Sequence, residues 1–243
     1  MLRAFVDAPL APGLRLALPD EVAAHIVRVL RLQPGDGCVL LNGDGHHYDA
    51  RLLSAGKRGA EAEVVAARAV DAESPLRIVL LQGIARGEKM DLVLQKATEL
   101  GVAGFVPVSS ERSEVKLAGE RVDRRLAHWR GVVASACGQC GRARLPVVAA
   151  PASLDAACAA LEAGGTRLLL DPVATASIAT LDGIGDRGVV LAVGPEGGWS
   201  PRDRGALQAA GFVGVRLGPR VLRTETAGLA AIAALQARFG DLG

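Results

Sequence analysis

The spacing of hydrophobic and polar positions changes once along the chain, and the two parts predict different kinds of structure. Between residues 35 and 56, apolar and polar residues alternate between Gly, Asp and Asn, which is typical of strands joined by tight turns. Residues 20–32 have apolar side chains, including Ile26 and Leu30, at helical spacing. Residues 1–72 are therefore expected to form a small β-rich, barrel-like module interrupted by one helix.

After Ser74 and Pro75, predicted strands alternate with predicted helices. The expected strands cover residues 77–84, 105–110, 145–149, 166–171, 188–194 and 212–218. The expected helices cover residues 87–101, 121–139 and 153–164, and two more begin near residues 200 and 224. This alternation predicts a parallel sheet with helices on both faces. We assign the α/β fold class, with residues 73–243 as one α/β domain.

The last predicted helix, which follows the sequence LGPRVLRTETA, consists almost entirely of Ala, Leu and Ile. A helix that is apolar on every side is typically buried, so polar groups at its start need partners. Thr224 or Thr226 can cap the helix, and Glu225 in its first turn suits the helix dipole. A cation there is unfavourable unless it pairs with an anion, so Arg223 is expected to pair either with Glu196 or Glu225 or with a ligand.

Three predicted strands end in unusual sequences: LLLDPVATAS, VVLAVGPEGGWS and RLGPRVLRTET. Ligands of parallel α/β sheets bind beyond the carboxyl ends of the strands. The glycines of GPEGG allow a backbone to approach a ligand closely, although an ordinary glycine-rich turn with an exposed Glu196 has the same sequence. Neither a GxxxxGK[ST] phosphate loop nor an early GxGxxG fingerprint is present. Ser200, Pro201 and Asp203 then predict a capping box that starts a helix.

Two further motifs have an ordinary interpretation beside a functional one. A zinc site at CGQC (137–140) lacks a second pair of ligands, and a thioredoxin-type motif would follow an early strand, so small residues in a close helix contact are favoured. His25, Arg28 and Arg31 share one face of the predicted helix. That face either is solvated or contacts phosphate groups.

Composition narrows the possible classes of protein. Half of the 243 residues are hydrophobic, which is enough for a proper core, whereas aromatic residues make up 3% and argue against rows of base-stacking platforms. The net charge of +2 decides little. The first residues, MLRAFVDAPLAPG, lack the apolar core of a signal peptide, and no apolar run approaches the roughly 18 residues of a membrane span. A cytoplasmic location without membrane contact is expected.

Several segments, in order along the chain, resemble the motifs of one family. LVLQKATELGV, PVSSERS, ACGQCGR, GPEGGWS and LGPRVLRTETA are similar to segments of the bacterial 16S rRNA uridine-N3 methyltransferases, the RsmE family within the SPOUT superfamily. HIVRVLRLQPGD resembles the N-terminal module of that family. The similarity spans about residues 25–230, and GPEGG together with LGPRVLRTETA is specific. One departure is Gly138, where the family is expected to have Glu.

The resemblance implies a PUA-like RNA-binding β-barrel over residues 1–72 and a SPOUT α/β domain with a C-terminal trefoil knot over residues 73–243. It also implies S-adenosylmethionine as the cofactor and a homodimer with the active site at the subunit interface. The implied cofactor-binding residues are Leu170, Asp171, Gly194, Glu196, Gly197, Gly198, Leu217, Gly218, Val221, Leu222 and Thr226. The expected RNA-binding residues are His25, Arg28, Arg31, Gln139 and Arg142.

The implied reaction is methylation of N3 of a uridine in the 16S rRNA of the small ribosomal subunit, in the decoding region. Loss of the N3 proton spreads negative charge onto O2 and O4, and a fixed cation, Arg223, is expected to stabilise that charge. Glu196 and Glu225 are the candidate proton acceptors, and no metal is required. Two alternatives stay open: a SPOUT methyltransferase that acts on another RNA nucleotide, and a non-catalytic RNA-binding protein.

Overall fold

The computed structural model describes residues 2–57, 59–115 and 119–243, which form two compact units. The N-terminal unit consists of the described part of Met1–Glu73 with Ala134–Leu145, and the C-terminal unit of the described part of Ser74–Val133 with Pro146–Gly243. The pattern of the sequence does not reveal that residues 134–145 pack with the N-terminal unit. The division into a PUA-like β-barrel over residues 1–72 and a SPOUT domain over residues 73–243 stays a prediction.

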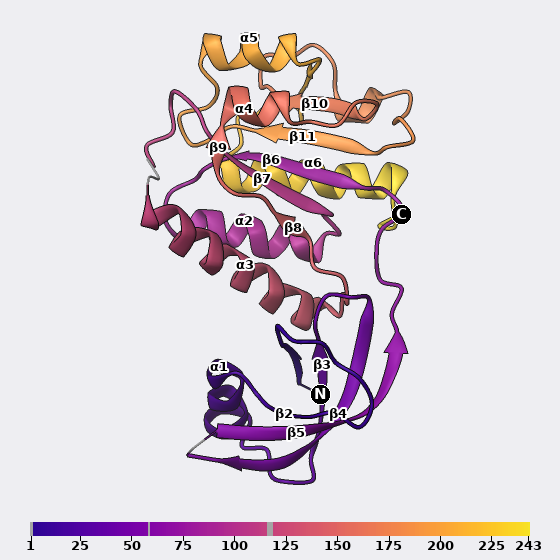
Figure 1. Ribbon diagram of the computed structural model, residues 1–243. Helices are drawn as coiled ribbons and strands as arrows, with labels where there is room; N and C mark the ends of the chain where they lie inside the picture. Colours follow the sequence, from indigo (N-terminus) through magenta and orange to yellow (C-terminus); the bar gives the residue numbers. More distant parts are fainter. Residues whose placement is uncertain (1, 58, 116–118) are drawn as a thin grey trace. The chain divides into compact units, whose positions relative to one another are not determined.

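One sheet with the strand order β1-β3-β4-β5-β2 forms the N-terminal unit (Figure 1). Its elements are β1 (Arg3–Phe5), β2 (Arg15–Ala17), α1 (Asp20–Ala24), the π-helix η1 (His25–Leu30), β3 (Gly37–Leu41), β4 (His46–Gly56) and β5 (Gly59–Ala69). β1 pairs with β3 in parallel, and the other neighbours are antiparallel. β1 and β2 are the two edges, so the described strands form an open sheet where the sequence suggests a barrel.

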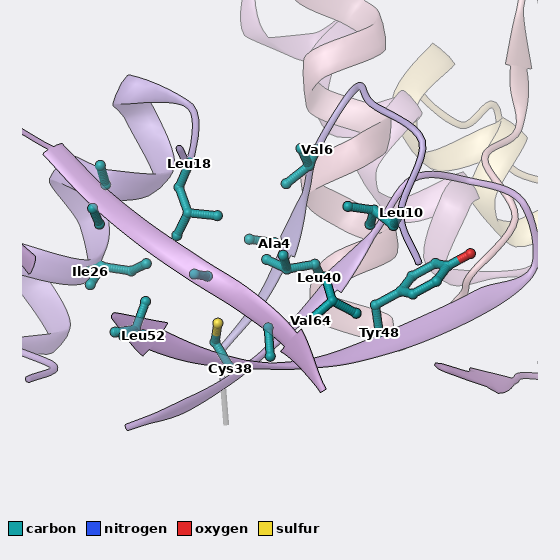
Figure 2. Packing of buried hydrophobic residues seen from close by; sticks show 14 residues of the cluster. Ala4, Val6, Leu10, Leu18, Ile26, Cys38, Leu40, Tyr48, Leu52 and Val64 are labelled. Atoms are coloured by element: carbon teal, nitrogen blue, oxygen red, sulfur yellow. The ribbon is translucent and has the colours of Figure 1, made fainter. Parts of the chain in front are cut away.

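Alternate residues of the long strands fill the core of this unit, because successive side chains of a strand point to opposite faces. Cys38 and Leu40 of β3 pack with Tyr48 and Leu52 of β4 (Figure 2). The buried ring of Tyr48 still has a partner for its hydroxyl, which donates to Asp44 Oδ2 at 2.6 Å. This sheet face is therefore apolar without leaving that hydroxyl unsatisfied.

The helix expected over residues 20–32 is α-helical only in its first half. From His25 it continues as the π-helix η1, and Arg31 ends it in the left-handed conformation at φ 53°. A π-helix closes i to i+5 hydrogen bonds, so its side chains are spaced at a smaller angle per residue than those of an α-helix. Ile26 is fully buried, but Leu30 is 40% exposed. Of these two apolar residues at helical spacing, Ile26 packs in the core of the N-terminal unit and Leu30 does not.

The end of helix α3 (Glu120–Cys140) belongs to the N-terminal unit and packs closely on β1. Arg3 Nη1 donates to the carbonyl oxygens of Gly138 and Gln139, each at 3.2 Å, and so satisfies groups that a helix end leaves without partners. A Cβ at position 138 would lie 3.0 Å from the backbone oxygen of Arg3. Glycine at position 138 therefore allows the end of α3 to lie close to the backbone of β1.

The C-terminal unit is built on a parallel sheet with the strand order β12-β10-β11-β6-β7-β8, and β9 also pairs with β7. Its strands are β6 (Ile78–Gly83), β7 (Gly104–Ser109), β8 (Val147–Val148), β9 (Ala152–Ser153), β10 (Thr166–Leu170), β11 (Val189–Val193) and β12 (Val213–Val215). Its helices, besides most of α3, are α2 (Glu88–Glu99), α4 (Leu154–Ala159), the 3-10 turn η2 (Ile178–Thr180), α5 (Pro201–Ala209) and α6 (Thr224–Phe239). The predicted parallel α/β sheet is confirmed.

Helices cover both faces of this sheet, as the strand and helix alternation predicts (Figure 1). α4 and α5 pack over one face with a core that includes Leu81, Leu169 and Leu207, and α6 lies on the other face beside α2 and β11. α6 buries one side, including Ile232 and Leu235, while Ala233 and Ala234 on its other side are half-buried. The prediction of burial on every side is therefore wrong for this helix. Among the described residues, no helix combines the length and apolarity of a membrane-spanning segment.

The carboxyl end of β6 touches the GPEGG segment directly. A Cβ on Gly83 would lie 2.5 Å from Pro195 Cδ and 2.6 Å from Pro195 N. Any larger residue at position 83 would push the GPEGG loop away from the sheet, since such distances are far below van der Waals contact. Glycine at this strand end therefore sets the position of the loop.

We expect Gly83→Ala to lower the stability of the C-terminal unit by about 1–3 kcal/mol, the usual cost of inserting a methyl group into a packed site. Gly205→Ala is the matched control, because its new methyl group lies on exposed α5 with no neighbour within 4 Å. That change replaces a glycine inside a helix and is expected to stabilise by about 0.5–1 kcal/mol. Thermal unfolding of the two variants and the wild type measures both effects, and equal midpoints would contradict the contact.

Candidate active site

The three strand ends that the sequence singles out line one cavity of about 530 Å³ at the carboxyl edge of the C-terminal sheet. They follow β10, β11 and β12, which are neighbours in the sheet, as expected for a ligand site in a parallel α/β fold. All the expected cofactor-binding residues except Thr226 line the cavity. Thr226 is exposed on the first turn of α6.

The start of α6 differs from the capping arrangement expected for its threonines. Arg223 is the N-cap residue, in an extended conformation, and no side chain caps the helix. The hydroxyl of Thr224 instead donates to the carbonyl oxygen of Gly194 at 2.5 Å and accepts from Gln82 Nε2 at 3.0 Å. The predicted threonine cap is wrong because Thr224 is buried and bonds to the neighbouring strand ends.

Arg223 is exposed and lines the cavity. Within the described ranges of the chain, no hydrogen bond or ion pair joins its guanidinium to Glu196, to Glu225 or to another residue. Of the two roles expected for Arg223, the internal ion pair is therefore not formed. A cation that lines a cavity at a helix N-terminus without a protein partner is suited to bind an anionic or electron-rich ligand.

Glu196, in the middle of GPEGG, is bound to the segment that starts α2. Its Oε1 accepts from the backbone N of Arg86 at 3.1 Å and from Lys89 Nζ at 3.2 Å. Burial alone would raise the pKa of Glu196, but these hydrogen bonds and the charge of Lys89 outweigh it and lower the pKa below its ordinary value. Glu196 is thus held as an anion and anchors the loop.

Glu225 has a different environment from Glu196. It lies in the first turn of α6 and lines the cavity. Its Oε2 is buried and has no hydrogen-bond partner among the residues that the structure describes. An unpartnered buried carboxylate oxygen is costly, and such groups are usually explained by a ligand, a water molecule or a role in catalysis.

The glycines of GPEGG serve the loop in different ways. Gly198 has φ 64°, a conformation that favours glycine. A Cβ on Gly197 would lie 3.0 Å from Arg112 Cβ, and Arg112 Nη1 donates to the carbonyl oxygen of Gly197 at 3.1 Å. Gly197 therefore allows close packing against the loop that follows β7, in addition to lining the cavity.

Arg220, which the sequence places among the charged groups before the last helix, lines the cavity, but sequence reasoning missed four other lining cations: Lys89, Arg112, Arg204 and Arg216. Arg204 is the one for which the sequence holds a signal. The capping box of Ser200 and Asp203 is present as predicted, so Arg204 falls in the first turn of α5, where a cation needs an anion. That anion is Asp171, whose Oδ2 lies 2.5 Å from Arg204 Nη1.

The expected RNA-binding residues all lie in the N-terminal unit, but they differ in exposure. His25, Arg28 and Arg31 are exposed on or beside η1, and Gln139 is exposed near the end of α3. Arg142 is only 4% exposed, and its guanidinium forms an ion pair with Glu73 in which Nη2 and Oε2 are 2.5 Å apart. Arg142 is therefore a structural ion-pair residue in this fold, and the expectation that it contacts RNA is not supported by its placement.

The CGQC segment has the features of packed thiols. Cys137 is buried, and burial raises its pKa to about 12. The Sγ of Cys140 points to the carbonyl oxygen of Cys137, one turn back along α3. No group of three or more His, Cys, Asp or Glu side chains that could hold a metal ion occurs among the described residues. The close helix contact favoured from the sequence is the arrangement observed.

We expect Cys38 and Cys137 to resist thiol reagents in the folded protein. Burial raises the pKa of Cys38 to about 11 and that of Cys137 to about 12, so the reactive thiolate is scarce below those values. Titration with a chromogenic disulfide at pH 8 is expected to modify these two thiols only after denaturant is added. Rapid modification of either thiol in the native protein would contradict the assignment.

Family comparisons agree with this arrangement of a cavity-bearing unit and a smaller N-terminal unit. Residues 72–236 match the family described as RNA methyltransferase domain, and residues 18–65 match the RNA methyltransferase PUA domain. The chain is 34% identical over 235 residues to ribosomal RNA small subunit methyltransferase E of Mycobacterium bovis, which covers 95% of this chain and 89% of that protein. It is 33% identical over 227 residues to the protein of the same name from Buchnera aphidicola, covering 93% and 92% of the two chains.

Solved structures give the same result. A ribosomal RNA small subunit methyltransferase E from Neisseria gonorrhoeae, crystallised with S-adenosylmethionine, has a TM-score of 0.90 and 39% identity over 100% of both chains. A Legionella pneumophila protein in complex with the same cofactor has a TM-score of 0.91 and 35% identity over 99% of both chains. The chain therefore belongs to the ribosomal RNA small subunit methyltransferase E family, with an RNA methyltransferase domain and a PUA domain.

Proposed function

We propose that this protein transfers the methyl group of S-adenosylmethionine to N3 of a uridine in 16S rRNA. The observation that carries the proposal is the cavity at the ends of β10, β11 and β12, with the unpaired Arg223 among its lining residues. The proposed substrate is the decoding region of the small ribosomal subunit in the cytoplasm. Membership of the methyltransferase E family supports the reaction class.

The residues of the cavity fit S-adenosylmethionine. A volume of about 530 Å³ lies in the range of small-molecule sites. The lining combines apolar side chains, such as Val193 and Leu222, with backbone groups of the glycine-containing loops. Asp171 adds a single oriented carboxylate that can accept from hydroxyl groups. This set suits a nucleoside with a polar ribose and apolar faces.

The protein contributes positioning and charge to the proposed reaction. When bound, S-adenosylmethionine supplies an electrophilic methyl group carried by a sulfonium. Arg223 stabilises the negative charge that spreads onto O2 and O4 of the uridine as N3 loses its proton. The neutral N3–H is a poor nucleophile, so holding the ionised base beside a fixed cation is the main electrostatic task of the site.

Of the two candidate proton acceptors, we favour Glu225. Glu196 is committed to Arg86 and Lys89, and the lowered pKa of its carboxyl opposes protonation. Glu225 lines the same cavity and keeps one carboxylate oxygen without a partner among the described residues. Glu196 then acts as a positioning residue that holds the GPEGG loop.

Three further features belong to this proposal: the RNA-binding role of residues 1–72, a homodimer and a trefoil knot in residues 73–243. The half-buried side of α6 supports a homodimer. The path of the chain supports a knot. After the edge strand β12, it returns past β10 so that α6 packs beside β11, and Arg238 donates to the carbonyl oxygens of Ile178 and Leu181 between β10 and β11.

A methyl-transfer assay tests the function directly. It uses tritiated S-adenosylmethionine and small ribosomal subunits from cells that lack the modification, followed by nucleoside analysis. Label in N3-methyluridine is the expected result. Label in another nucleoside would favour a methyltransferase with a different target, and absence of both label and cofactor binding would favour a non-catalytic RNA-binding protein.

Arg223→Ala is expected to reduce turnover by about 10²-fold or more, the scale of losing one preorganised electrostatic group. The side chain is exposed and bonds to no described residue, so the thermal midpoint and the Kd for S-adenosylmethionine should change little. Single-turnover methylation and calorimetry measure the two effects separately. Near-normal turnover would overturn the assigned role of Arg223.

Arg204→Leu is expected to raise the Kd for S-adenosylmethionine about tenfold, which corresponds to about 1.4 kcal/mol, because the Asp171 carboxylate loses the charge that orients it. Arg204→Lys should restore part of the affinity. Arg202→Leu is the matched control: it lies on the same helix with a 72% exposed side chain and pairs only loosely with Glu111 and Asp155. Calorimetry that found equal effects at positions 202 and 204 would refute the positioning role.

A further inference from the structure

The cations that line the cavity fall into two groups. Three of them have protein partners: Lys89 bonds to Glu196, Arg112 to the carbonyl oxygen of Gly197, and Arg204 to Asp171. The other three, Arg216, Arg220 and Arg223, all lie on the loop between β12 and α6. We call this segment, residues 216–223, the arginine loop.

None of these three guanidinium groups forms a hydrogen bond or an ion pair within residues 2–57, 59–115 and 119–243. All three residues are exposed. The backbone of the loop is nevertheless held at its start, because Arg216 N donates to the carbonyl oxygen of Ala176 at 2.9 Å and its own carbonyl accepts from Ile178 N at 3.3 Å. The backbone of the arginine loop is therefore fixed at Arg216, while its three guanidinium groups are free to bind a ligand.

The charges that face the cavity leave an excess of positive charge at this loop. Asp171 and Glu196 are already paired with Arg204 and Lys89. Among the described lining residues, Glu225 alone remains to offset the three arginines of the arginine loop and Arg112, whose partner is a neutral carbonyl, so four positive charges against one negative leave three in excess. Like charges so close along the chain repel one another, and an anion bound among them would relieve that repulsion.

We propose that Arg216 and Arg220 bind the RNA phosphates that flank the target nucleotide, while Arg223 faces the base. This inference rests on the proposed function and names the part of the substrate that this loop holds. Arginine matches the geometry of phosphate oxygens with two parallel N–H groups. Phosphate contacts fix the register of a strand without reading its sequence.

The composition of the cavity favours backbone contacts over base stacking. Trp199 is the aromatic residue among the described lining residues, and it is only 4% exposed. A strand that enters the cavity therefore finds no exposed aromatic face on which neighbouring bases could stack. Electrostatic attraction to the phosphates is the remaining source of affinity that these residues offer for the nucleotides beside the target.

The salt dependence of RNA binding tests the proposal. The probe is a fluorescein-labelled RNA fragment of the 16S decoding region, and its anisotropy is measured with full-length protein at several KCl concentrations. Arg216→Ala and Arg220→Ala should each reduce the slope of log K against log salt by about 0.7, the value for one phosphate of a single strand, and the double variant by about twice that. Arg124→Ala, an exposed change on α3 outside the cavity, should leave the slope unchanged.

A modified RNA locates the contact. Replacing one flanking phosphate with an uncharged methylphosphonate should lower the affinity of the wild type but add little to the loss in the variant whose arginine binds that phosphate. Calorimetry with S-adenosylmethionine should give the wild-type Kd for both single variants. Unchanged slopes in the variants would overturn the proposal. If the same variants also bound S-adenosylmethionine more weakly, these arginines would be assigned to the cofactor carboxylate instead.

The proposal and the proposed function fail separately. If methyl transfer to uridine is absent but the two variants still lower the salt slope and respond to the methylphosphonate, the phosphate site stands and the target nucleotide is different. If methyl transfer to uridine is present and the slopes of both variants equal that of the wild type, the function stands and the phosphate site is refuted. Thermal midpoints of the variants confirm that each is folded.

Discussion

The hydroxyl of Thr224 is the point on which the arrangement of the cavity depends. It donates to Gly194 at the end of β11 and accepts from Gln82 at the end of β6. Thr224 is 6% exposed and Gln82 is fully buried, so neither group has water as an alternative partner. Removing the hydroxyl would take one hydrogen bond from the buried amide of Gln82 and one from the half-buried carbonyl of Gly194. The first residue of α6 is in this way attached to two strand ends that are far away in the sequence.

Much of the fold can be predicted from local patterns of residues in the sequence. The alternation of strands and helices after residue 74, the capping box at Ser200 and the three unusual strand ends all depend on local residue order, and the structure has each of them. The π-helix after His25 does not follow from such patterns, because the same apolar residues fit an α-helix equally well. Of this π-helix, Ile26 is buried in the core of the N-terminal unit.

The position of the cavity could be predicted from the sequence, whereas the contacts among its charged side chains could not. GPEGG and LRTETA line the cavity, as their positions after neighbouring strands predict, but the different surroundings of Glu196 and Glu225 depend on Lys89, which precedes Glu196 by more than a hundred residues. The pairing of Arg204 with Asp171 is similarly non-local. Thr224 shows the opposite error: a local rule for helix caps gives a reasonable answer, and long-range hydrogen bonds override it.

Residues 134–145 have a consequence for how such a protein can be rearranged during evolution. The chain passes between the two units after Glu73, after Val133 and after Leu145. A gene segment that encoded only residues 1–73 would lack the helix end that Arg3 caps and the guanidinium that pairs with Glu73. Recombination with a single pair of breakpoints around residues 1–73 therefore could not transfer the whole N-terminal unit, because residues 134–145 would be left behind. The two units are therefore expected to be inherited together, because residues 134–145 of the N-terminal unit lie in the sequence between two segments of the C-terminal unit.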